Sequence, residues 1–317
     1  TLDRPFVPTF GRASSAVAAG EQAAIRELLT RRDLLRQVGE AYTDAKTTVT
    51  LRSVEGTNDS VLLHVEERTT LTYAKLVGDE PDYTEFVTGR DFRFARDASG
   101  WVLQSQSLSS QEGPAPINEP TGASAAAMKA AAQQILVART KSEEVPQGGS
   151  WRASGQMTAL AGYNYPAMAA YAETYWSSYN PSYRTFAERG GDCTNFVSQA
   201  MRAGGWTDVT GFYRDDNDWW YNFLNQTWSW INVDYWYAFA ALRSHRTYIL
   251  SQPESMLLAD VLQADFTNDT SKDHTMIVSY RSSTQPYLTY HTTDTFRRSL
   301  SSLKLAYPSA RWIPHRT

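Results

Sequence analysis

The stretch that decides the fold of the C-terminal half is RGGDCTNFVSQAMRAGGW, residues 189–206, which holds the only cysteine of the chain. Apolar residues recur in it at positions 193, 196, 197, 200 and 201, the spacing of one helical face. The segment predicts a helix that begins at Cys193, with Asp192 as its N-cap and with Gly204 and Gly205 at its end.

Two interpretations of Cys193 follow from this position. Cysteine is a small, often buried hydrophobic residue, so Cys193 can simply pack in the core with Phe196 and Val197. In the first turn, however, free N–H groups and the helix dipole stabilise a thiolate. The same N–H groups can bind an oxyanion, with Asp192 and Asn195 as supporting side chains. The local pattern alone leaves both interpretations open.

A nucleophilic cysteine needs a base, and the chain has five histidines. For three of them, a structural role fits the sequence position better than a catalytic role: His64, His245 and His315. His274 opens the apolar segment HTMIV, and His291 ends the segment YLTYH. If these strands form a hairpin with its tip between residues 282 and 283, His274 and His291 are opposed on one face, about 5 Å apart at Cβ. A register change of one residue would separate them.

Residues 12–108 have the pattern of an α+β domain. An approximate helical stripe over 15–44 is followed by four segments of alternating polarity, 47–54, 60–76, 83–96 and 100–108, with turn residues between them. A helix followed by an antiparallel meander is loosely similar to cystatin-like or nuclear-transport-factor-like folds, on topology alone.

Residues 109–157 are expected to be a linker that contains an alanine-rich helix near 123–140 and a polar stretch at 141–156. A second α+β domain is expected over 158–317. It begins with a helix that Asn164 caps and that has Pro166 in its first turn. Apolar strands are predicted at 257–266, 274–281, 286–293 and 310–314.

Composition excludes some classes of function. The formal net charge is −4, which does not favour nucleic-acid binding. No apolar run approaches the roughly 20 residues of a membrane span. A single cysteine permits no intrachain disulfide. The chain begins at Thr1 without methionine, so we expect a removed targeting segment, and we expect a monomer.

Other segments permit a functional and a structural interpretation. Residues 206–239 are dense in aromatic residues and are expected to be mostly core, with Trp219 and Trp220 exposed at a cleft rim to bind substrate. The aspartates of DFTNDTSKD, residues 265–273, alternate as in a calcium loop. Thr270 and Met276 replace the glycine and glutamate of such a loop, so we predict a solvated turn and no metal.

The segments GGDCTNFVSQAMRAGGW, YNYPAMAAYAETYWSSYNPSY, WWYNFLNQTWSWINV and ADVLQADFTNDTSKDHTMIVSY together resemble the amidase domain family of bacterial secreted and envelope proteins. The resemblance covers about residues 160–315. It implies a papain-like cysteine hydrolase related to CHAP amidases and NlpC-type endopeptidases, with Cys193 as nucleophile, His274 as base and His291 as the polar third member. Asp294 is the alternative third member.

The resemblance also implies a substrate and a location. No metal or organic cofactor is needed, the favoured substrate is cell-wall peptide, and the expected location is the cell envelope or the extracellular space. Two alternatives remain: an inactive module that binds cell-wall peptide or glycan, and an acyltransferase that uses the same residues.

Overall fold

The computed structural model describes residues 12–110, 112–142, 162–187, 189 and 191–317. The predicted elements of the N-terminal part are confirmed: α1 (Ser15–Gln37), β1 (Tyr42–Gly56), β2 (Ser60–Tyr73), β3 (Tyr83–Asp97) and β4 (Gly100–Leu108). Helix α1 ends earlier than its stripe indicates. Gly39 takes a φ of +73°, a left-handed conformation that glycine adopts without strain and that stops a helix.

The C-terminal part mixes helices and strands. Asn164 Oδ1 accepts the N–H of Ala167, which confirms the predicted cap of α4. The elements are α4 (Tyr165–Tyr175), α5 (Cys193–Ala203), α6 (Trp228–Ile231), α7 (Val233–Tyr237), a π-helical turn (Ala238–Arg243), β5 (Tyr248–Ile249), a 3₁₀ turn (Pro253–Ser255), β6 (Val261–Asp265), β7 (His274–Arg281), β8 (Pro286–Tyr290), β9 (Thr295–Ser299), α8 (Leu300–Ala306) and β10 (Arg311–Arg316).

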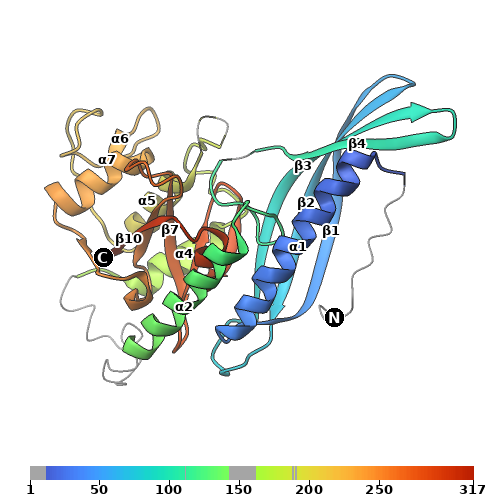
Figure 1. Cartoon of the computed structure of the whole chain (residues 1–317). Coiled ribbons are helices and arrows are strands. Elements are labelled where there is room, and N and C mark those ends of the chain that lie inside the picture. Colours follow the sequence, from blue (N-terminus) through green and yellow to red (C-terminus); the bar gives the residue numbers. More distant parts are fainter. Residues whose placement is uncertain (1–11, 111, 143–161, 188, 190) are drawn as a thin grey trace.

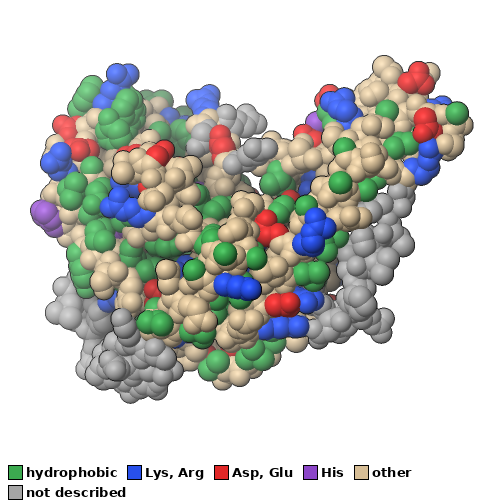
Figure 2. All heavy atoms as spheres, viewed as in Figure 1, with side chains coloured by type: hydrophobic (Ala, Val, Ile, Leu, Met, Phe, Trp, Pro, Cys, Tyr) green, Lys and Arg blue, Asp and Glu red, His purple; other side chains and the backbone are tan. Residues whose placement is uncertain are grey.

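One antiparallel sheet of ten strands joins the two parts, so the chain is an α+β protein. Its order is β1-β2-β3-β9-β8-β7-β6-β10-β5, with β4 paired to β3. The junction is short: Glu85 pairs with Phe296, and Phe86 pairs with Thr295. Figure 1 shows β1–β4 extending away from the C-terminal part, with α1 along them. On the face drawn in Figure 2, basic and acidic side chains are interspersed.

The segment after β4, expected to be an open linker, is packed instead. Pro114, Pro116 and Ile117 are buried, and Ile117 lies in a cluster with Leu71 and Phe86. Helix α2 (Ala125–Ser142) follows and shares a core with α1 and α8. Residues 143–157 of the expected linker, including most of its polar stretch, lie outside the described residues.

The C-terminal core lies under α5. This helix buries nine consecutive residues, Cys193 to Met201, and large aromatic residues of the 206–239 region pack against it. Among the described helices, none is long and apolar enough to cross a membrane.

Candidate active site

Helix α5 begins at Cys193, as the sequence predicts, but Asp192 does not cap it with its side chain. The Asp192 carboxylate turns back and accepts hydrogen bonds from the backbone N–H of Phe186 (2.8 Å) and from Nδ2 of Asn195 (2.9 Å). The N–H groups at the start of α5 are therefore left without the usual side-chain cap. This arrangement keeps a potential oxyanion site beside the cysteine.

The start of α5, which carries the predicted nucleophile, packs on the start of β7, which carries the predicted base. Oγ1 of Thr194 lies 3.0 Å from Oγ1 of Thr275, and the backbone N–H of Thr275 donates toward the Cys193 sulfur. The backbone contact of the sulfur is therefore with the residue that directly follows His274.

Both groups are nearly inaccessible to solvent. Cys193 is 7% exposed and His274 is 1% exposed. Burial raises the pKa of the Cys193 thiol, an effect that the N–H of Thr275 opposes. Burial, together with positive charge on His291, lowers the pKa of His274 to about 3. The site therefore holds a neutral thiol and a neutral imidazole. Here desolvation outweighs the helix terminus that was expected to favour a thiolate.

His274 has an unused nitrogen. Its Nε2 atom is buried and has no hydrogen-bond partner among the described residues. Buried polar atoms are almost always paired, and an unpaired one is often a functional atom. The ring is packed edge-on against Tyr290, with centroids 5.2 Å apart.

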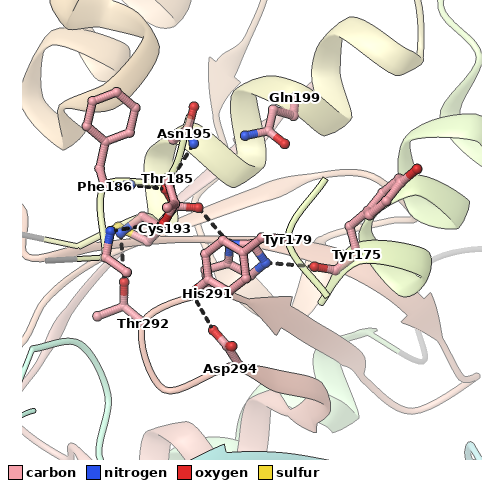
Figure 3. A network of polar contacts seen from close by, with 12 residues as sticks. Tyr175, Tyr179, Thr185, Phe186, Cys193, Asn195, Gln199, His291, Thr292 and Asp294 are labelled. Atoms are coloured by element: carbon pink, nitrogen blue, oxygen red, sulfur yellow. Dashed lines mark hydrogen bonds and ion pairs between the residues drawn. The ribbon is translucent and has the colours of Figure 1, made fainter. Parts of the chain in front are cut away.

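His291 makes a different set of contacts from those predicted. Its Nδ1 lies 2.7 Å from Oδ2 of Asp192, and its Nε2 lies 2.7 Å from the carbonyl oxygen of Tyr175 (Figure 3). The ring is stacked between Phe196 and Tyr179, at centroid distances of 4.0 and 4.1 Å. Both ring nitrogens of His291 therefore face oxygen atoms of other residues, so the ring is fixed at both ends.

The predicted pairing of the two histidine rings is therefore wrong. Within the hairpin Ile277 pairs with Thr289, and a register shift follows between residues 278 and 280. Strand β8 ends at Tyr290, so His291 leaves the ladder and points to Asp192. A bulge of this kind changes which side chains share a face, and the sequence does not reveal it.

The turn after His291 also holds the cysteine segment. Oγ1 of Thr292 accepts the N–H of Asp192 at 3.0 Å. Thr292 and Thr293 both have a φ of +64°, which is strained for β-branched residues and is often associated with functional sites. The segment YHTT contains no signal for a left-handed turn, so this contact is not predicted from the sequence.

Asp294, the alternative third member, is bonded to Tyr179 and not to His274. Its Oδ1 accepts the Tyr179 hydroxyl at 3.1 Å (Figure 3). Burial raises the pKa of Asp294, and positive charge on His291 opposes the shift. Asp294 thus fixes the hydroxyl end of Tyr179, the ring that stacks on His291.

Asn195 and Trp219, predicted to support or contact substrate, have structural roles instead. Asn195 is fully buried; its Nδ2 donates to Arg184 O and to Asp192, and its Oδ1 accepts from Trp230 Nε1. It has no group left for an oxyanion. Trp219 was expected at the rim but is fully buried, with Nε1 donating to Ser198. Trp220 is half-buried and donates to the carbonyl of Gly211.

The acidic segment 265–273 ends directly before His274. Asp265 accepts the backbone N–H groups of Asp269 and Thr270, as in a polar turn. A surface hollow is lined by Phe212, Arg214, Asp215, Asp216, Asp234, Tyr235 and Ala238, and it includes none of the Cys193 cluster. The described residues contain no group of three potential metal ligands.

Fold and site together define an α+β protein whose C-terminal half packs a helix that begins with a cysteine on a strand that begins with a histidine. Residues 162–313 match the model of the family described as "Putative amidase domain", which supports the amidase-domain resemblance and a hydrolase activity of this half.

Two curated relatives from Bacillus subtilis are each 31% identical to part of the chain. "Uncharacterized protein YhbB" aligns over 123 residues, 37% of this chain and 37% of its own length. "Uncharacterized protein YjcM" aligns over 178 residues, 49% of this chain and 38% of its own length. The match therefore spans under two-fifths of either relative. A solved structure, the Kfla4162 protein from Kribbella flavida, matches 30% of this chain and 95% of its own length at 20% identity, with a TM-score of 0.19.

Proposed function

We propose that the C-terminal half is a cysteine-dependent amide hydrolase of papain-like mechanism. The observation that carries this proposal is the packing of α5 on β7 through Thr194 and Thr275. The contact is one residue along β7 from His274, whose Nε2 has no hydrogen-bond partner among the described residues, and this supports the assignment of His274 as the base for the single cysteine. The similarity of residues 162–313 to an amidase domain supports the same reaction class.

In the proposed reaction, His274 takes the proton of the Cys193 thiol as the sulfur attacks the amide carbonyl carbon. The oxyanion is stabilised by N–H groups at the start of α5. The C–N bond then breaks, His274 returns its proton to the leaving amine, and a thioester remains on Cys193. Water attacks the thioester with His274 as base, which releases the carboxylic acid and restores the thiol.

His291 has a positioning role in this scheme. It pairs with Asp192, the residue before the nucleophile, and so fixes the turn from which Cys193 projects. We assign this role to His291 in place of the predicted one, in which His291 would orient the His274 ring directly.

Cell-wall peptide in the envelope or outside the cell is the proposed substrate and location, on the strength of the amidase-domain similarity alone. We also propose that the protein acts as a monomer. Mass spectrometry of digests from a panel of peptidoglycan fragments and peptides tests the substrate. A product that carries an added amine or alcohol instead of water would assign acyl transfer.

The decisive variants are Cys193→Ala and His274→Ala, with the exposed His245→Ala as the matched control. Cys193→Ala should abolish turnover and lower stability by no more than about 1–2 kcal/mol. His245→Ala should retain wild-type turnover. Turnover by Cys193→Ala at the wild-type rate would end the proposal.

An inactive binding module is the second candidate, and the burial of both Cys193 and His274 favours it. Iodoacetamide separates the two functions, because the chain has one thiol. If His274 is the working base, alkylation of Cys193 at neutral pH is slower in His274→Ala than in the wild type, whereas a structural cysteine reacts at the same rate in both.

A further inference from the structure

The segment that joins the N-terminal sheet to α2 passes over the candidate site. A methyl group on Gly113 would lie 3.1 Å from Cε1 and 3.2 Å from Nδ1 of His274, and 2.8 Å from the carbonyl oxygen of Thr292. The backbone of Gly113 is thus in direct contact with the proposed base, and its φ of +74° suits glycine.

The preceding residue reaches the other side of the site. A methyl group on Gly191, two residues before Cys193, would lie 3.6 Å from Oε2 of Glu112. Glu112 therefore lies near the turn that precedes Cys193, and Gly113 lies against His274 at the start of β7. The contact with Gly113 accounts for part of the burial of His274, which is 1% exposed.

Contacts further along the chain hold this segment down. The N–H of Ala115 donates to the Tyr307 hydroxyl at 2.5 Å, and its carbonyl accepts from Nη1 of Arg298 at 2.7 Å. Arg298 is fully buried, and Pro114 is buried beside Ala115. We call residues 112–115 the strap.

We propose that the strap is an intramolecular occupant of the active-site cleft, and that it must leave before a substrate can reach Cys193. This inference rests on the proposed hydrolase function. Because the occupant is a stretch of polypeptide, the cleft is suited to an extended peptide backbone. Opening returns water to the site, which removes the desolvation that keeps the thiol and the imidazole neutral.

Gly113→Ala tests the strap, and Gly122→Ala is its matched control. Both glycines have left-handed backbones, with φ of +74° and +75°, so alanine is strained at either. Only at Gly113 does the new methyl group meet the site; at Gly122 nothing lies within 4 Å. Tyr307→Phe is a second variant, which removes one tether of the strap and keeps the ring that stacks on Phe266.

The readout is the rate of Cys193 alkylation by iodoacetamide at neutral pH, followed by mass spectrometry beside a thermal-unfolding control. We expect Gly113→Ala to raise the rate about tenfold and Tyr307→Phe several-fold. Gly122→Ala should match the wild type. If Gly113→Ala does not fold, Tyr307→Phe alone decides.

Wild-type alkylation rates in the folded strap variants would overturn the inference, and so would an equal rise in Gly122→Ala. The proposed hydrolase function fails separately. If alkylation rises in the strap variants but no amide in the substrate panel is cleaved, the strap stands and the hydrolase assignment does not.

Discussion

Asp192 is the residue on which the geometry of the site depends. Its carboxylate accepts from Phe186, Asn195 and His291, and its own N–H donates to Thr292. An aspartate before a cysteine at a helix start is expected to cap the helix. Here it is used to hold the turn from three directions, so that the position of the sulfur is determined by residues distant in the sequence.

His291→Ala should therefore lower the stability of the protein as well as its turnover rate. The variant removes the hydrogen bond between His291 and the buried Asp192 carboxylate, and leaving a buried polar group without its partner costs about 1–3 kcal/mol. Urea unfolding measures this loss. We expect kcat to fall more than KM changes, because the turn that carries Cys193 loses its alignment.

The double variant Asp192→Asn, His291→Ala is the control for that result. It removes the uncompensated charge. Its loss in free energy of unfolding should therefore be smaller than the sum of the losses in the two single variants. Asp294→Asn keeps an acceptor for the Tyr179 hydroxyl and should be close to wild type. A loss below about 1 kcal/mol in His291→Ala would contradict the pairing.

Periodicity in the sequence predicts most of the elements. The four N-terminal strands, α4, α5 and the start of β7 follow from local patterns and caps. The short elements β9 and α8 are missed, although Ser299 caps α8 by accepting the N–H of Ser302, a signal that inspection of residues 299–303 could have found.

What the sequence does not reveal is the pairing between distant elements. The register shift in the β7–β8 hairpin separates His274 from His291, and the β3–β9 junction merges two expected domains into one sheet. The sequence of the strap is polar and proline-rich, which is typical of a linker. Only its contacts with His274 and Arg298 identify it as a packed segment. Such contacts depend on tertiary structure, which local propensity does not encode.

The strap makes a prediction about proteolysis with a glutamyl-specific protease. Glu112 is exposed and is followed by Gly113, so the bond after it is a possible cleavage site. Cleavage needs a locally unfolded segment. We expect Gly113→Ala to be cut after Glu112 faster than the wild type, as followed by mass spectrometry of the fragments. Equally rapid cleavage after Glu112 in the wild type and in Gly113→Ala would mean that the segment is an open linker.

At the scale of the whole molecule, the continuous sheet gives the N-terminal part a physical connection to the site. Ser109, at the end of β4, donates to the backbone of Gly89 and to Asp91 on β3, and β3 pairs with β9. The chain therefore enters the strap from the N-terminal sheet and leaves it towards α2.

The whole molecule should also lose stability in mild acid, because it buries two neutral histidines. Burial lowers the pKa of both His274 and His315 to about 3, aided by positive charge on His291 and Lys272 respectively. His315 is satisfied as a neutral ring: its Nδ1 accepts from Thr247 and its Nε2 donates to Gln263.

In the unfolded chain these rings bind protons below a pKa of about 6.5, while the folded chain excludes them until about pH 3. The stabilisation is therefore complete above pH 6.5 and is lost as the pH falls. Two such groups give a slope of about 2.7 kcal/mol per pH unit well below pH 6.5. Urea unfolding at pH 7.0, 6.0 and 5.5 measures this slope. His315→Gln should remove about half of it, and the exposed His245→Gln should leave it unchanged. Equal slopes in wild type and His315→Gln would show that the buried ring is protonated in the folded state.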